Sequence, residues 1–201
     1  NKNLGIAFNA GSASLDSQGA NFPGTVVDDA SIGNTAWSNT SYAESDTDSG
    51  LAASITYSGG GLAQSDYLKA TGFGFSIPTG STITGIAVDV RRKGANPFQT
   101  DTNAQLVKGG VIQTTNKAAG ESLPYSSFTD RTFGSSTTLW SNSWTPSDIN
   151  SSNFGFAYGA NDGTYAVYVD SISITVYYID TSGQTQWAVG SPASSGRSEE
   201  R

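Results

Sequence analysis

Two stretches of the chain alternate apolar and polar residues with a period of two, which is the spacing of a β-strand and not of a helix. In residues 83–90, Ile86, Val88 and Val90 share one face. Residues 165–178 alternate in the same way, but their apolar face changes sides near Asp170, which indicates a bulge or a bend. A chain whose strongest patterns repeat every second residue has to build its core from sheets.

Shorter strand patterns occur at residues 52–57, 67–75, 104–108, 111–114, 137–140 and 154–158. Turn residues separate them, and Lys108-Gly109-Gly110 predicts a hairpin because Gly supplies the positive φ that such turns need. Asn161-Asp162-Gly163 predicts another turn before the last long strand. One helical turn is expected at 145–149, where Thr145 caps a helix that begins at a proline. These signals predict an all-β fold, an antiparallel β-sandwich of jelly-roll type.

The chain of 201 residues is long enough for one large β domain with arms. Residues 1–24 are rich in Gly, Ser and Ala and are expected to form an N-terminal arm, residues 25–180 a sandwich domain, and residues 181–201 a polar C-terminal arm. Charged residues make up only 13% and aromatic residues 11%, whereas disordered chains are usually rich in charge and poor in aromatics. The chain is therefore expected to fold.

Composition excludes several classes of partner. The net charge of −7 disfavours nucleic acid, which needs clustered Lys and Arg. The basic run Arg91-Arg92-Lys93 ends a strand pattern, and we interpret it as a strand end in solvent. No apolar run approaches the roughly 20 residues that cross a bilayer, so no membrane association is expected.

Catalytic patterns are hard to find. The chain has no Cys and no His, which removes thiolate sites and the commonest general base. It has no phosphate-binding loop and no Ser-x-x-Lys spacing. A glycosidase would need paired carboxylates, yet Glu44 and Glu121 are the only glutamates in the domain. We therefore predict that the protein is not an enzyme.

The acidic residues lie in polar stretches that we interpret as solvated loops. Glu44, Asp46 and Asp48 form a partial echo of a calcium-binding loop, because carboxylates in flexible loops suit Ca²⁺. They are weak candidate ligands, and no other cofactor is predicted. The remaining acidic loop residues under this interpretation are Asp28, Asp29 and Asp101.

Two sets of apolar residues suggest different roles. The four tryptophans Trp37, Trp140, Trp144 and Trp187 could stack on sugar rings, but core packing is the favoured interpretation for Trp37 and Trp140, because aromatic side chains dominate cores. Trp187 instead stands alone in the polar C-terminal arm. Such isolated apolar residues in the arms are candidate interface anchors, and the full set is Leu4, Ile6, Phe8, Trp187 and Val189.

Eight segments carry a resemblance to a known family. They are PGTVVDD at 23–29, AWSN at 36–39, DYLKATGFGFSIP at 66–78, GIAVDV at 85–90, LVKGG at 106–110, LW at 139–140, WTPSDIN at 144–150 and ITVYY at 174–178. In their order they resemble a β-sandwich module of tailed-phage structural proteins and related prophage and metagenomic sequences. The resemblance implies a virion surface component and no site residues.

Three functions stay open at this point. The resemblance favours a phage structural protein on the virion surface, a capsid decoration, head-fibre or tail-appendage subunit that binds other copies of itself and other virion proteins. The first alternative is a carbohydrate-binding or adhesin module that binds surface glycans. The second is a subunit of a bacterial filament or surface layer. Exposed Trp or Tyr side chains in a groove would favour the carbohydrate-binding module.

Overall fold

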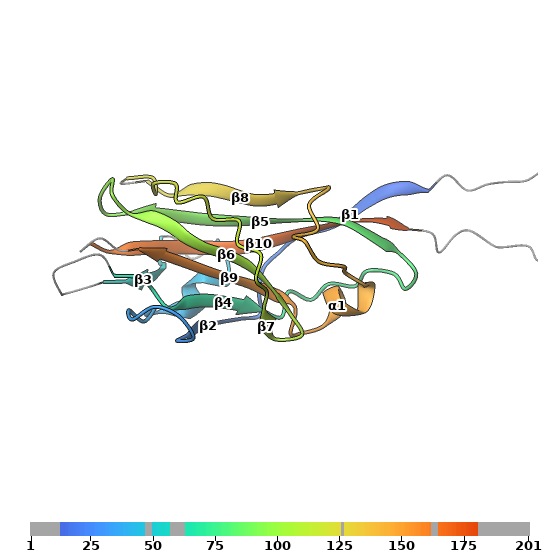
Figure 1. Ribbon diagram of the computed structural model, residues 1–201, viewed down its shortest axis with the longest axis horizontal. Helices are drawn as coiled ribbons and strands as arrows, with labels where there is room; N and C mark the ends of the chain where they lie inside the picture. The colour runs from blue at the N-terminus through green and yellow to red at the C-terminus, as the bar shows by residue number, and fades with distance from the viewer. Residues whose placement is uncertain (1–12, 47–49, 57–62, 126, 162–164, 181–201) are drawn as a thin grey trace, which may run out of the picture.

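The computed structural model describes residues 13–46, 50–56, 63–125, 127–161 and 165–180 (Figure 1). In chain order the elements are β1 (Ser14–Asn21), β2 (Thr25–Asp29), the 3₁₀ helix η1 (Thr40–Ala43), β3 (Ala53–Ile55), β4 (Tyr67–Thr71), β5 (Thr82–Gly94), β6 (Thr100–Lys108), β7 (Val111–Ile112), β8 (Thr129–Ser135), α1 (Pro146–Asn150), β9 (Gly155–Asn161) and β10 (Val167–Asp180). No helix in these ranges is long and apolar enough to span a membrane.

The described strands form two five-stranded sheets that pack against each other (Figure 1). Sheet A has the order β8-β5-β10-β1, and the short β3 also pairs with β10. Sheet B has the order β2-β4-β9-β6-β7. The pairings between these strands are antiparallel. The predicted all-β, antiparallel sandwich is confirmed.

The two strands with the clearest alternation, β5 and β10, lie side by side in the middle of sheet A. Val90 pairs with Ile172 and Val88 with Ile174, so the apolar faces of both strands point the same way. The register shifts between Val169 and Ser171, which confirms the bulge predicted near Asp170.

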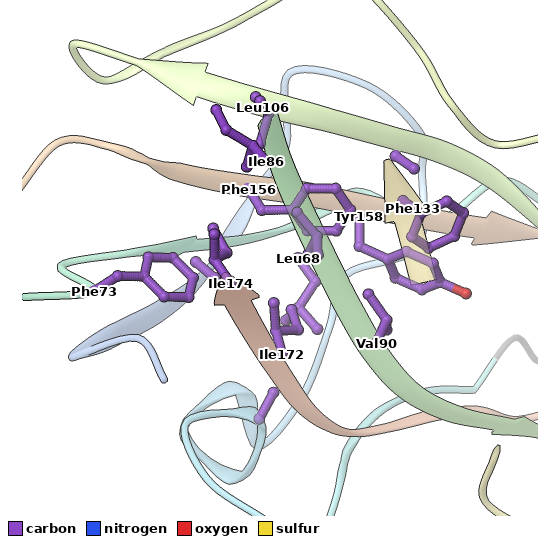
Figure 2. Packing of buried hydrophobic residues seen from close by; sticks show 14 of the residues in the cluster. Leu68, Phe73, Ile86, Val90, Leu106, Phe133, Phe156, Tyr158, Ile172 and Ile174 are labelled. Atoms are coloured by element: carbon purple, nitrogen blue, oxygen red, sulfur yellow. The ribbon is translucent and has the colours of Figure 1, made fainter. Parts of the chain in front are cut away.

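The core lies between the sheets. Val90, Ile172 and Ile174 of sheet A meet Phe156 and Tyr158, which point inward from β9 of sheet B (Figure 2). Each of these side chains is fully buried. Burying an apolar side chain of this size stabilises the fold by roughly 1.5–3 kcal/mol, so this layer supplies the main favourable term of folding.

Trp37 and Trp140 are core residues, as predicted, and Trp144 is buried as well. Each indole N–H donates to a backbone carbonyl, from Trp37 to Asp66 at 2.9 Å and from Trp140 to Ile86 at 2.9 Å. The interior therefore takes up the large rings without leaving their polar atoms unpaired.

The local turn predictions hold where the structure describes them. Gly109 and Gly110 have φ values of 58° and 85° and join β6 to β7. Thr145 caps α1, and its side chain and that of Asp148 form a capping box. Of the turn predicted at 161–163, only Asn161 lies within the described residues.

Several strand boundaries differ from prediction, most of all at residues 14–21 and 137–140. Residues 14–21, assigned to the N-terminal arm, form β1 and pair with β10. β1 is an edge strand with both faces largely exposed, so it carries no apolar alternation. Residues 137–140 are a turn, because Trp140 and Ser141 have positive φ, and the strand of this region is β8.

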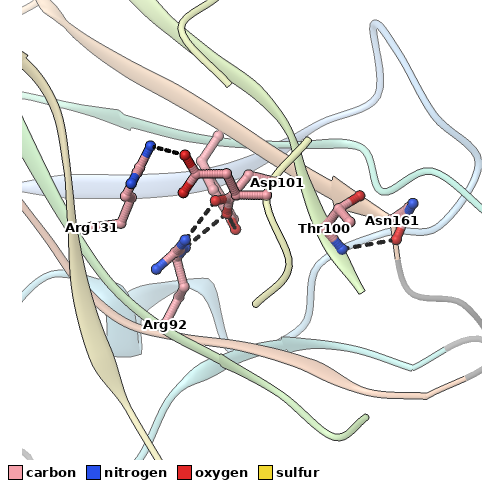
Figure 3. Close-up of polar contacts among 7 residues, drawn as sticks. Arg92, Thr100, Asp101, Arg131 and Asn161 are labelled. Atoms are coloured by element: carbon pink, nitrogen blue, oxygen red, sulfur yellow. Dashed lines mark hydrogen bonds and ion pairs between the residues drawn. The ribbon is translucent and has the colours of Figure 1, made fainter. Parts of the chain in front are cut away.

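Arg92 and Asp101 correct two further predictions. Arg92 was expected in solvent and Asp101 in a polar loop, but their side chains are only 4% and 1% exposed. Arg92 Nε and Nη2 donate to the two carboxylate oxygens of Asp101 at 2.8 and 2.6 Å (Figure 3). Tyr158 also donates to Asp101. Burial, and then the charge of Asp101, raise the pKa of the Tyr158 hydroxyl well above its ordinary value.

Candidate functional site

The outer face of sheet A carries a row of polar side chains opposite the core. Because successive residues of a strand point to opposite faces, the alternation that buries Val88 and Val90 turns Asp89 and Arg91 outward. Ser173 pairs with Asp89 and Ser171 with Arg91 across β10. Small serines beside longer charged side chains leave this part of the sheet hollow.

A groove of about 330 Å³ occupies this hollow. Its floor consists of Asp89 and Arg91 of β5 with Ser171 and Ser173 of β10, and β8, β1 and two connecting segments supply its walls. We call it the sheet A groove, and its lining residues are Ala20, Phe22, Asp46, Asp89, Arg91, Asp130, Ser171 and Ser173. Its volume is within the range of small-molecule sites in proteins.

The lining of the groove carries more negative than positive charge, because Asp46, Asp89 and Asp130 face a single cation, Arg91. Arg91 Nε donates to Asp170 at 2.8 Å, and Arg91 Nη1 lies 3.6 Å from Asp130. The hydroxyl of Thr132 donates to Asp89. The guanidinium is therefore matched by two carboxylates, and the carboxylates of Asp89 and Asp130 can accept from further donors as well. Such a surface suits a neutral ligand with many hydroxyl groups better than an anion.

Phe22 supplies the one aromatic ring of the groove. It follows β1 directly, and its side chain remains 36% exposed. Its neighbours hold the segment in place, because Pro23 is buried and Asn21 Nδ2 donates to the carbonyl of Phe73 at 2.9 Å. A ring fixed at the wall of a polar groove offers a flat apolar face to a ligand.

Two of the three weak calcium candidates, Glu44 and Asp46, lie within the described residues. Glu44 Oε1 accepts from the backbone amide of Val26 at 3.1 Å, so it ties the end of η1 to β2. Asp46 is exposed and lines the sheet A groove, and Asp48 lies outside the described residues. Among the residues that the structure describes, no group of three or more His, Cys, Asp or Glu side chains is placed to hold a metal ion.

The predicted interface anchors cannot be placed. Leu4, Ile6, Phe8, Trp187 and Val189 lie outside the described residues, so their role in assembly stays a prediction.

The sequence did not single out the groove, although it held a signal. Asp89, Ser171 and Ser173 are outward positions of the two clearest strand patterns, and all three are small or polar. Because ordinary surface strands carry such residues too, the signal was not specific to a groove. What the pattern could not supply is the position of Phe22 and Asp46, which reach the same face from connections far apart in the chain.

Comparisons with known proteins give little. No family model matches the chain, and no curated protein matches it. Among solved structures, the CBM22-1 xylan-binding domain of Xyn10C from Paenibacillus barcinonensis is similar at 12% identity with a TM-score of 0.41, over 83% of this chain and 97% of that domain. The BiXyn10A CBM1 domain in its apo form is similar at 9% identity with a TM-score of 0.33, over 80% and 99%. At scores of this size, what the chain binds has to be argued from its own surface.

Proposed function

We propose that the chain is a non-catalytic carbohydrate-binding domain whose sheet A groove takes part of a neutral polysaccharide chain. This is the second of the functions that the sequence leaves open. The observation that carries the proposal is the groove itself, in which hydrogen-bonding side chains form the floor and the exposed ring of Phe22 stands at the wall.

The chemistry of a sugar ring matches this arrangement. A sugar presents hydroxyl groups around its edge and an apolar C–H surface on its face. The carboxylates of Asp89 and Asp130 accept from hydroxyls, the hydroxyl of Ser173 and the guanidinium of Arg91 donate, and Phe22 can lie against the ring face. Each group of the ligand thus has a partner of the opposite kind.

The same contacts support binding without hydrolysis. Cleavage of a glycosidic bond needs one carboxylic acid as proton donor beside a carboxylate. In the groove, Asp89 accepts a hydrogen bond from Thr132, and Asp130 forms an ion pair with Arg91 at 3.6 Å. The proposal therefore assigns both carboxyl groups to binding.

Affinity electrophoresis in gels that contain one soluble polysaccharide each, followed by calorimetry with the matching oligosaccharides, tests the proposal. Phe22→Ala is expected to weaken binding at least about tenfold, or ~1.4 kcal/mol. Leu139→Ala is the matched control, because Leu139 is also 36% exposed but does not line the groove. Failure of every neutral polysaccharide to retard the protein, or an equal effect of both substitutions, would overturn the proposal.

A further inference from the structure

Three aromatic side chains project from the end of the sandwich where β5 turns into β6. Phe98 is 76% exposed, Tyr125 63% and Tyr165 55%. They come from three connections, between β5 and β6, between β7 and β8, and between β9 and β10. This end lies at the left of Figure 1, opposite α1. We call the three side chains the aromatic end.

One buried amide ties the three connections together. Gln99 is fully buried, and its Nε2 donates to the carbonyls of Tyr165 at 2.6 Å and Ala166 at 2.9 Å. Its backbone carbonyl accepts from Leu123 at 2.7 Å. The amide of Gly94 donates to Pro124 at 2.9 Å, which holds the residue next to Tyr125. The backbone that carries the three rings is thus cross-linked from inside.

The ion pair of Arg92 and Asp101 lies near the same turn, two residues from Gly94 and from Gln99 (Figure 3). It joins β5 of sheet A to β6 of sheet B, so the two sheets cannot slide apart at this end without separating buried charges. Rigid presentation of exposed rings lowers the entropy cost of binding, because little remains to be ordered when a ligand arrives.

Phe128 and Tyr168 form a strip with Lys93 beside the sheet A groove, three residues along the chain from Tyr125 and from Tyr165 respectively. Lys93 Nζ lies 4.3 Å from the ring centre of Phe128 and 5.1 Å from that of Tyr168, so the ammonium group makes cation–π contacts with both rings. Lys93 pairs with Tyr168, and the next outward pair along these strands is Arg91 with Ser171 of the groove. Two residues along a strand span roughly 7 Å, so the strip and the groove are contiguous.

We propose that the aromatic end is a second sugar-binding surface, which takes a more distant part of the polysaccharide chain that lies in the sheet A groove. This inference rests on the proposed function. A linear polymer is the ligand that reaches both places. Three aromatic side chains bury roughly 150–250 Å² each when fully covered. Their sum is below the roughly 800 Å² that one partner gives to a standard protein interface, so the rings suit a sugar chain better than a second protein.

Calorimetry with oligosaccharides of increasing length tests this inference on the full chain. The probes are disaccharides, tetrasaccharides and octasaccharides of the cello, xylo and manno series. Phe98→Ala and Tyr165→Ala are expected to leave the affinity for the shortest bound sugar unchanged and to weaken octasaccharide binding at least about fivefold. Val111→Ala is the control, because Val111 is 65% exposed and lies in β7, outside both surfaces.

The outcomes separate the two proposals. If octasaccharides bind no better than short sugars and the ring substitutions change nothing, the second surface is wrong while the groove stands. If the ring substitutions weaken binding but Phe22→Ala does not, the aromatic end binds sugar and the groove does not. If no sugar binds, both proposals are wrong.

Discussion

Arg92 and Asp101 show how far a single residue can depart from its pattern. Both were assigned to solvent because a run of basic residues and an isolated aspartate are usually surface features. In the structure each satisfies the other's charge between the sheets, with two hydrogen bonds between guanidinium and carboxylate. The partner lies nine residues away on another sheet, and no local pattern encodes that distance.

Asp101→Ala is expected to lower the free energy of unfolding by about 3–5 kcal/mol, because it leaves the Arg92 guanidinium buried without a counter-charge. Urea unfolding followed by fluorescence measures the change. Asp130→Ala is the control, since Asp130 lies 3.6 Å from Arg91 with its side chain 62% exposed, and such a pair contributes less than about 1 kcal/mol. Equal losses of stability in the two variants would show that the buried ion pair contributes no more to stability than the exposed one.

Asp66 gives the fold a pH dependence of defined sign. Burial, then the neighbouring charge of Asp28, raise the pKa of the Asp66 carboxyl above its ordinary value of 3.8. The folded state thus favours the protonated form. The stabilisation is complete below pH 3.8 and is lost as the pH rises through the higher folded-state pKa.

Asp66→Asn is therefore expected to raise the melting temperature at pH 7, since the amide is neutral and can donate to Asp28. The gain over the unmodified protein should shrink as the pH falls below the folded-state pKa. Thermal unfolding of both proteins at each pH measures the difference between their melting temperatures. The other carboxyl groups are the same in both proteins, so their effects cancel in this difference. A gain that grows toward low pH would contradict the assigned sign.

At the scale of elements, two glycines with positive φ differ in what surrounds them. Gly134 in β8 has a φ of 85°, and a Cβ there would lie 2.3 Å from the carbonyl oxygen of Ile86 and 2.9 Å from Trp140 Nε1. Gly109 in the β6–β7 turn has a φ of 58°, and a Cβ there would meet nothing within 4 Å. The first position combines backbone strain with a clash, and the second has strain alone.

Gly134→Ala is expected to cost roughly 2–4 kcal/mol of stability, and Gly109→Ala roughly 1 kcal/mol. Chemical unfolding of the two variants measures both values under the same conditions. A smaller loss at Gly134 than at Gly109 would mean that β8 can shift away from Ile86 without cost.

The sequence predicted the elements whose pattern lies in neighbouring residues, and it missed those whose structure depends on pairing with a distant strand. The alternation of β5 and β10, the hairpin at Gly109 and the capping box at Thr145 all follow from neighbouring residues, and all are confirmed. β1, β2 and β8 are edge strands whose outer faces need no apolar residues, so their patterns are weak. The sheet A groove was missed because its lining residues come from strands and connections that are far apart in the sequence and meet only in the folded sheet.

At the scale of the whole molecule, the prediction that the arms carry assembly keeps its own test. The pairings of β10 with β1, β3 and β5 are made by residues 167–180. Deleting residues 181–201 is therefore expected to leave the melting temperature within about 2 °C of the full chain. Calorimetry measures this stability.

Sedimentation velocity of the full and shortened chains then measures self-association, with Trp187→Ala as the single-residue variant. The prediction is weaker self-association in both variants. Unchanged self-association would remove Trp187 as an anchor, and an unfolded shortened chain would show that the segment belongs to the sandwich.

The pairing of Ser14 with Asp180 determines how the sandwich could be inserted into a larger polypeptide. The first and last described strands are antiparallel neighbours, so the start of β1 and the end of β10 lie close together, at the end of the sandwich opposite the aromatic end. A domain whose ends are adjacent can be inserted into a loop of a host protein without increasing the distance between the two ends of that loop. By the same geometry, a short linker from Asp180 to Ser14 would permit circular permutation, with new ends opened at the turn between β6 and β7.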